Sequence, residues 1–171
     1  LIPNPRPLQP FSLSRHSGEE FAQDTLLDNW TFIAFGYTHC PDICPTTLSV
    51  LSQTADLVNE DTAKKGPQFV FVSVDPERDS LQRLATYVPY FNPDFIGATG
   101  PEADLQRLTG QLGILYRKVE DENTALDYLV DHSASIVLID PLGRLQAVFS
   151  PPHDAGKMAQ DFRVIEHNYR P

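Results

Sequence analysis

The chain has 171 residues, of which 41% are apolar and 10% aromatic, enough to fill the core of one domain of ordinary size. Its formal net charge of −10 argues against nucleic-acid binding, because binding phosphates requires clustered Lys and Arg side chains. No stretch approaches the roughly 20 apolar residues that span a bilayer, so the chain as given is expected to be soluble. We expect one domain over residues 1–171, with an irregular, proline-rich arm at residues 1–10.

After this arm, residues 11–22 indicate a short strand or a hairpin with a glycine turn. Apolar runs typical of buried strands then alternate with segments whose apolar residues recur every three or four positions, as in amphipathic helices. We expect strands at 30–37, 68–75 and 95–100, and helices at 46–60, 80–91 and 102–113. This alternation predicts a parallel sheet with right-handed crossovers.

The C-terminal part of the sequence has a different pattern. Residues 135–150 predict two strands around a Pro-Leu-Gly turn, and residues 153–170 predict a closing helix. The segments 118–127 and 150–154 are expected to be exposed loops. A βαβ unit followed by ββα, with both cysteines after the first central strand, is the thioredoxin arrangement. We therefore predict an α/β, thioredoxin-like fold: a central mixed sheet flanked by helices, with an N-terminal extension and a late hairpin.

Both cysteines of the chain, Cys40 and Cys44, lie in the segment FGYTHCPDICPTTL, and each precedes a proline. Pro45 suits the first position of the following helix, where its missing N–H costs nothing, and it biases Cys44 away from helical backbone angles. We therefore expect Cys44 at the N-cap or in the last loop position, with both sulfurs at a helix N-terminus. The positive end of the helix dipole favours the thiolate, which is both the nucleophile and the metal ligand.

The spacing of three residues between the cysteines permits a disulfide, and it also permits two thiolates to bind one metal. Two thiolates and one imidazole suit Cu(I), which accepts three ligands, whereas structural Zn(II) normally takes four. His132 is a candidate for the imidazole, because the loop entering a late strand packs near the thiols in a thioredoxin-like fold. From position alone, a loop-capping or core role for His132 is the commoner one. The other histidines are His16 and His167 near the chain ends, His39 beside Cys40, and His153 in a predicted exposed loop.

Three sequence blocks occur in order along the chain: FGYTHCPDICPTTL at 35–48, VSVDPERDS at 72–80 and DYLVDHSASIVLIDPLGRL at 127–145. In this order they resemble the Sco/SenC family of copper-binding proteins of cytochrome c oxidase assembly. The resemblance implies a thioredoxin-like fold that binds copper, Cu(I) or Cu(II), through Cys40, Cys44 and His132. It also implies a role in maturing the binuclear copper-A site in subunit II of the oxidase.

The resemblance leaves two functions open. A copper-binding assembly factor would pass the ion to a partner by ligand exchange, which is not strictly an enzymatic activity. A thiol-disulfide oxidoreductase would attack a partner disulfide with one of Cys40 and Cys44 and resolve the mixed disulfide with the other, while His132 tuned their pKa. A peroxidase and a domain with an inert disulfide are minor alternatives.

The hypothesis of a copper-binding assembly factor also predicts the compartment and the partners. Copper delivery to a respiratory oxidase implies the bacterial periplasm, or the mitochondrial inner membrane facing the intermembrane space. The family is anchored to the membrane by an N-terminal helix that is absent from this chain. The acidic surface could dock a basic copper donor or acceptor.

Two further groups have structural alternatives to a functional role. Asp75 or Asp79 could cap a helix and Arg78 could form an ion pair with a neighbouring carboxylate, or the block could dock a partner. Asp131 could orient the imidazole of His132 or stabilise its loop. His153 remains without an assigned role.

Overall fold

The computed structural model describes residues 2–38, 43–59, 66–114, 116–120, 128–132 and 135–171. At residues 43–44, 117–120 and 128–132 it describes the backbone alone. No helix within these ranges combines the length and the apolar character needed to cross a membrane.

The predicted helices and strands occur in the predicted order along the chain, together with two strands that were not predicted, Tyr116–Glu120 and Tyr128–His132. The strands are β1 (Ser12–Arg15), β2 (Glu20–Ala22), β3 (Thr31–Gly36), β4 (Gln68–Ser73), β5 (Ile96–Thr99), β6 (Tyr116–Glu120), β7 (Tyr128–His132), β8 (Ile136–Ile139) and β9 (Leu145–Phe149). The helices are α1 (Ile43–Val58), α2 (Leu81–Phe91), α3 (Glu102–Leu112) and α4 (Ala155–His167), with a short 3₁₀ helix at Gln23–Leu26.

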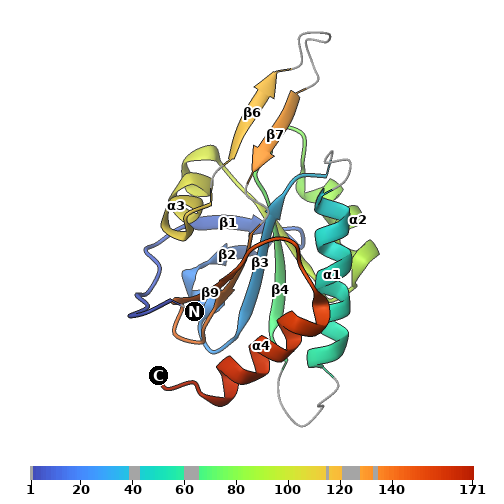
Figure 1. Ribbon diagram of the computed structural model, residues 1–171. Helices are drawn as coiled ribbons and strands as arrows, with labels where there is room; N and C mark the ends of the chain where they lie inside the picture. Colours follow the sequence, from blue (N-terminus) through green and yellow to red (C-terminus); the bar gives the residue numbers. More distant parts are fainter. Residues whose placement is uncertain (1, 39–42, 60–65, 115, 121–127, 133–134) are drawn as a thin grey trace.

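Seven of these strands form one mixed sheet in the order β2–β1–β5–β4–β3–β8–β9, and β6 and β7 form a separate antiparallel ribbon. The strands β3, β4 and β5 are parallel, as their alternation with helices predicted, and β8 and β9 are antiparallel neighbours. Along one side of the sheet, α1 contacts both α2 and α4 (Figure 1). The helix α3 lies apart from these three and packs on β1. The β6–β7 ribbon stands out from one end of the sheet (Figure 1).

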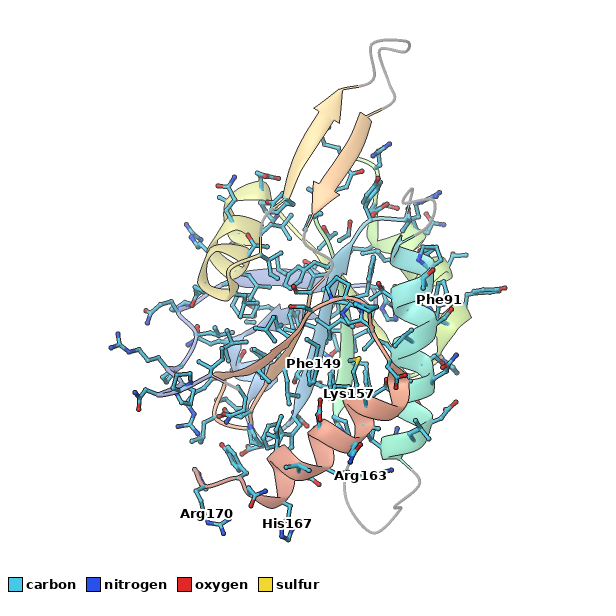
Figure 2. The ribbon with its side chains drawn as sticks, in the orientation of Figure 1. Phe91, Phe149, Lys157, Arg163, His167 and Arg170 are labelled. Carbon is cyan, nitrogen blue, oxygen red and sulfur yellow. The ribbon has the colours of Figure 1, made fainter. Side chains whose placement is uncertain are left out.

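The core is centred on β3, which pairs with β4 on one edge and β8 on the other. All six residues of β3 are buried, as expected for a strand that is apolar on both faces. The ring of Phe32 stacks on Phe69 with centroids 5.0 Å apart and contacts Phe149 at 6.0 Å and Phe162 of α4 at 5.5 Å. Figure 2 shows Phe149 beside α4 in the middle of the molecule.

The N-terminal extension adds to one edge of the sheet and reaches across to the other. The β1–β2 hairpin turns at Gly18, whose φ of 93° favours glycine, and β1 pairs with β5. The arm before it is irregular, as predicted, and lies against the β8–β9 turn. There the N–H groups of Ile2 and Leu8 donate to the carbonyls of Gln146 and Gly143, each at 2.9 Å.

A capping bond starts α4. Asp154 is the N-cap, and its Oδ1 accepts a hydrogen bond from the backbone N–H of Lys157 at 2.8 Å. Asp154→Ala is expected to lower the free energy of unfolding by about 1 kcal/mol, measured by urea denaturation, because it leaves that N–H without its acceptor. Gln160→Ala, on an exposed position of the same helix, is the control. Equal losses in both variants would show that the cap contributes nothing specific.

Two boundaries differ from the prediction. The helix α1 begins at Ile43, so Cys44 is its second residue and not a cap, and Pro45 is its third. The first four N–H groups of a helix have no partner within the helix, so proline is accommodated anywhere in the first turn. Residues 118–120, which were predicted to belong to an exposed loop, are part of β6, which extends to Glu120. His132, which was also predicted in a loop, is the last residue of β7.

Candidate metal centre

The described backbone around the predicted ligands converges on one end of the sheet. Cys44 lies in the first turn of α1, and Cys40 falls within residues 39–42, outside the described ranges, shortly after β3 ends. His132 ends β7, and β7 contacts β3. In Figure 1 β7 runs toward the end of β3 from which the chain continues to α1. The side chains of Cys40, Cys44 and His132 are outside what the structure describes.

This end of the sheet is also a point where the strand order changes direction. From β3 the chain passes through α1 to β4 on one side, whereas β8 occupies the other side of β3. In open α/β sheets, the carboxyl ends of strands at such a switch point border a crevice in which ligands bind. The topology therefore provides a place for a site at the segment that contains the cysteines.

A buried carboxylate holds the backbone just before that segment. Asp79 is fully buried and accepts hydrogen bonds from the N–H of Thr38 at 2.9 Å, the hydroxyl of Thr38 at 2.5 Å and the hydroxyl of Ser73 at 2.5 Å. The hydroxyl of Thr38 in turn accepts from Nε of Arg83. Because a buried carboxylate is costly unless it is fully hydrogen-bonded, this network ties Thr38 to β4 and α2.

A second buried carboxylate lies beside the first. Nε of Arg78 donates to Oδ2 of buried Asp75 at 2.6 Å, which confirms the predicted ion pair, and its guanidinium lies 5.4 Å from the ring centroid of Tyr37. The cap of α2 is Ser80, whose hydroxyl accepts from the N–H of Arg83 at 3.1 Å. The prediction that an aspartate of this block caps the helix is therefore wrong, because the Asp79 carboxylate binds Thr38 and Ser73 and the Asp75 carboxylate binds Arg78.

The base of the β6–β7 ribbon contains a contact that the sequence analysis missed. Tyr116, at the start of β6, is the cross-strand partner of His132. Its hydroxyl donates to Oε1 of Glu102, in the first turn of α3, at 2.8 Å. Burial raises the pKa of Tyr116 well above its usual value, and the hydrogen bond to Glu102 and the carboxylate charge raise it further. The phenol is therefore a proton donor throughout the physiological pH range.

The other candidate histidines have roles or positions away from this end. Nδ1 of His16 accepts from the N–H of Gly97 at 2.9 Å, and Nε2 of His153, which is half-buried in its loop, lies 3.0 Å from the carbonyl oxygen of Phe149. Figure 2 shows His167 on α4, at the end of the molecule opposite the ribbon. Among the described side chains, no three His, Cys, Asp or Glu residues could together hold a metal. His39 and the side chain of Asp131 lie outside the described residues.

Comparison with known proteins agrees with the resemblance in the sequence. Residues 3–166 match the model of the SCO1/SenC family. Protein SCO1 homolog 1, mitochondrial, of Arabidopsis thaliana is 38% identical over 161 residues, which cover 94% of this chain and 47% of the relative. Protein SCO1 homolog, mitochondrial, of Homo sapiens is 35% identical over 164 residues, which cover 94% of this chain and 53% of the relative. The chain therefore spans about half the length of these curated relatives.

Solved structures confirm the predicted fold class. Arabidopsis thaliana ScoI with copper bound matches with a TM-score of 0.88 and 35% identity, covering 96% of this chain and 100% of that one. BsSco, described as a member of the Sco family of cytochrome c oxidase assembly proteins, shares the fold with a TM-score of 0.75 at 15% identity, covering 99% of this chain and 98% of its own. With its mixed sheet flanked by helices and these matches over nearly its whole length, the chain belongs to the SCO1/SenC family.

Proposed function

We propose that the protein is a copper-binding assembly factor that holds one copper ion through Cys40, Cys44 and His132. The observation that supports this most directly is the contact of β7 with β3, because β7 ends at His132 and β3 leads into the cysteine segment. The copper-bound structure of the Arabidopsis relative, which is matched over its whole length, is consistent with this assignment.

The chemistry of the proposed donors fits copper. Thiolates and imidazole are ligands that Cu(I) accepts in a three-coordinate site, whereas calcium and magnesium require oxygen ligands. Cys44 lies in the first turn of α1, where the helix dipole favours the thiolate. The two buried carboxylates described nearby, Asp75 and Asp79, are directed to Arg78, Thr38 and Ser73. The proposed site therefore offers soft ligands, whereas the hard oxygens of the two nearby carboxylates are bound to other side chains and to backbone.

In this function copper is the cargo, and it leaves the protein by exchange of ligands with a partner. We infer that the acceptor is the binuclear copper-A site in subunit II of cytochrome c oxidase, and that a separate copper donor loads the protein. BsSco is described as a member of the Sco family of cytochrome c oxidase assembly proteins, which supports this partner. The net charge of −10 would attract basic surfaces on the donor or the acceptor.

We infer a location at a membrane that carries the respiratory oxidase. The bacterial periplasm, with an anchor in the inner membrane, is one such compartment. The mitochondrial inner membrane facing the intermembrane space is the other, and the Arabidopsis and human relatives are mitochondrial. Both compartments contain the respiratory oxidase that the proposed function requires.

Thiol-disulfide exchange is the second candidate function, and the position of Cys44 at a helix N-terminus in a thioredoxin-like fold favours it. One thiolate would attack a disulfide of the oxidase subunit or of another exported protein, and release one thiolate of that partner. The second thiolate would then attack the mixed disulfide, release the reduced partner, and leave Cys40 and Cys44 oxidised.

Replacing His132 separates these functions. In an anaerobic titration of reduced protein against a competing chelator, the unmodified protein should bind one equivalent of Cu(I), and His132→Ala should bind at least about tenfold more weakly, because a ligand is lost. His167→Ala, in the last turn of α4, is the matched control and should bind normally. Disulfide exchange by His132→Ala should persist at a changed rate. Equal copper binding by all three proteins, or no binding by any, would make thiol exchange the leading function.

A further inference from the structure

The position of the β6–β7 ribbon depends on contacts at its base. In the described part of the chain, the ribbon has no strand pairing with the seven-stranded sheet. A two-stranded ribbon is marginally stable on its own in water. Its orientation must therefore be set where β6 begins and β7 ends, and His132 is the last residue of β7.

The chain enters this base from the C-terminal end of α3. Gly113 caps the helix with a left-handed backbone at φ 69°, which reverses the chain direction. The N–H of Ile114 then donates to the carbonyl of Thr109 at 3.0 Å, and the side chain of Ile114 is buried in the core. The position of the chain is therefore fixed two residues before Tyr116.

Tyr116 ties β6 to the other end of the same helix. Its ring packs against the core, and its hydroxyl donates to Oε1 of Glu102, the first residue of α3, at 2.8 Å. Nε2 of Gln106 also donates to this carboxylate oxygen, at 3.3 Å. The start of β6 is thus attached to α3 at two points. Ile114 attaches it to the C-terminal end of the helix, and the hydroxyl of Tyr116 attaches it to the N-terminal end.

This attachment bears on His132 because the two residues are directly opposed in the ribbon. The Cα atoms of opposed residues in antiparallel strands lie about 4.5–5.5 Å apart, so a displacement of Tyr116 carries the backbone of His132 with it. We propose that Tyr116 is a positioning residue, whose hydrogen bond to Glu102 holds His132 where it can bind copper together with the thiols near α1. This inference rests on the proposed copper site.

The size of the effect follows from the fraction of molecules in which His132 is in place. The apparent dissociation constant equals the intrinsic one divided by that fraction. Tyr116→Phe removes only the hydroxyl, and the loss of one hydrogen bond to an exposed carboxylate should weaken copper binding about threefold to tenfold. The thiols are unchanged in this variant.

The test compares Cu(I) affinities, by anaerobic competition titration, of Tyr116→Phe, Glu102→Ala, Glu102→Gln and the double variant Tyr116→Phe with Glu102→Ala. Tyr90→Phe removes a hydroxyl from a tyrosine that is 85% exposed and is the matched control. Tyr116→Phe is also made in protein carrying His132→Ala. We expect equal losses from Tyr116→Phe and Glu102→Ala, no further loss in the double variant, and no loss from Tyr90→Phe. Glu102→Gln keeps the acceptor oxygen and should restore most of the affinity.

The combination with His132→Ala separates positioning from a general effect on the fold. A positioning residue acts only through His132, so Tyr116→Phe should have no effect once the imidazole is gone. An equal loss in both backgrounds would overturn the proposal, and so would unchanged affinity in Tyr116→Phe when copper binding does depend on His132. Copper binding that is absent, or that is the same with and without His132, would overturn the copper site and this inference together.

Discussion

Cys44→Ser is expected to abolish tight copper binding. Serine offers a neutral hydroxyl, a hard ligand, in place of a soft thiolate, and Cu(I) strongly prefers the thiolate. The loss should exceed the loss caused by His132→Ala, and we expect it to be more than about a hundredfold in dissociation constant. The measurement is an anaerobic titration of reduced protein with Cu(I) in competition with a chelator.

Ser49→Ala, at an exposed position on the same helix, is the control and should bind copper normally. Wild-type affinity in Cys44→Ser would show that Cys44 is not a ligand. Two separate single variants, Cys44→Ser and Cys40→Ser, also test thiol exchange. A protein that keeps only the attacking thiol should accumulate a mixed disulfide with its partner, because no second thiol can resolve it.

Asp79→Asn is expected to lower the free energy of unfolding by about 2–4 kcal/mol. Three donors, two from Thr38 and one from Ser73, point at the two oxygens of this buried carboxylate. Asparagine replaces one oxygen with an NH₂ group, so at least one of these donors loses its acceptor, and the charge that strengthens the remaining hydrogen bonds is lost as well. Urea denaturation followed by circular dichroism measures the loss.

Two comparisons test this explanation. Asp94→Asn, at an exposed loop position, should change stability by less than about 0.5 kcal/mol. Thr38→Ser keeps both donors to Asp79 and should remain close to the unmodified protein. A loss below about 1 kcal/mol in Asp79→Asn would show that the network contributes little to the fold. The copper affinity of Asp79→Asn would then show whether the network affects the proposed copper site.

The main elements were predictable because each carries a local signature. Thr31–Gly36 is apolar on both faces, and it is the buried central strand. The helix Leu81–Phe91 shows apolar residues at helical spacing, with Leu84 and Val88 buried. The turns at Gly18 and Gly143 have positive φ values, which sequence reasoning anticipates at glycines between strands. Such features depend only on neighbours along the chain.

The remaining features depend on contacts between distant segments. The segment Tyr116–Glu120 reads Tyr-Arg-Lys-Val-Glu, which lacks the alternation of apolar and polar residues typical of a half-buried strand, so its sequence did not mark it as one. Asp79 resembles a helix cap in its local sequence, and its bond to Thr38, 41 residues away, appears only in the fold. The set of Cys40, Cys44 and His132 came from family resemblance, and it stays a prediction because their side chains lie outside the described residues.

The central position of β3 has a consequence for how copper would leave. Its backbone is bonded to β4 and β8, so opening β3 requires breaking the sheet and costs nearly the full free energy of unfolding. The ribbon can separate at lower cost, because in the described chain its two strands pair only with each other, and its base is held by the exposed hydrogen bond from Tyr116 to Glu102. The two sides of the proposed site therefore differ in stiffness. A partner that displaced the ribbon would remove the imidazole first and leave the ion on two sulfurs, ready for stepwise exchange.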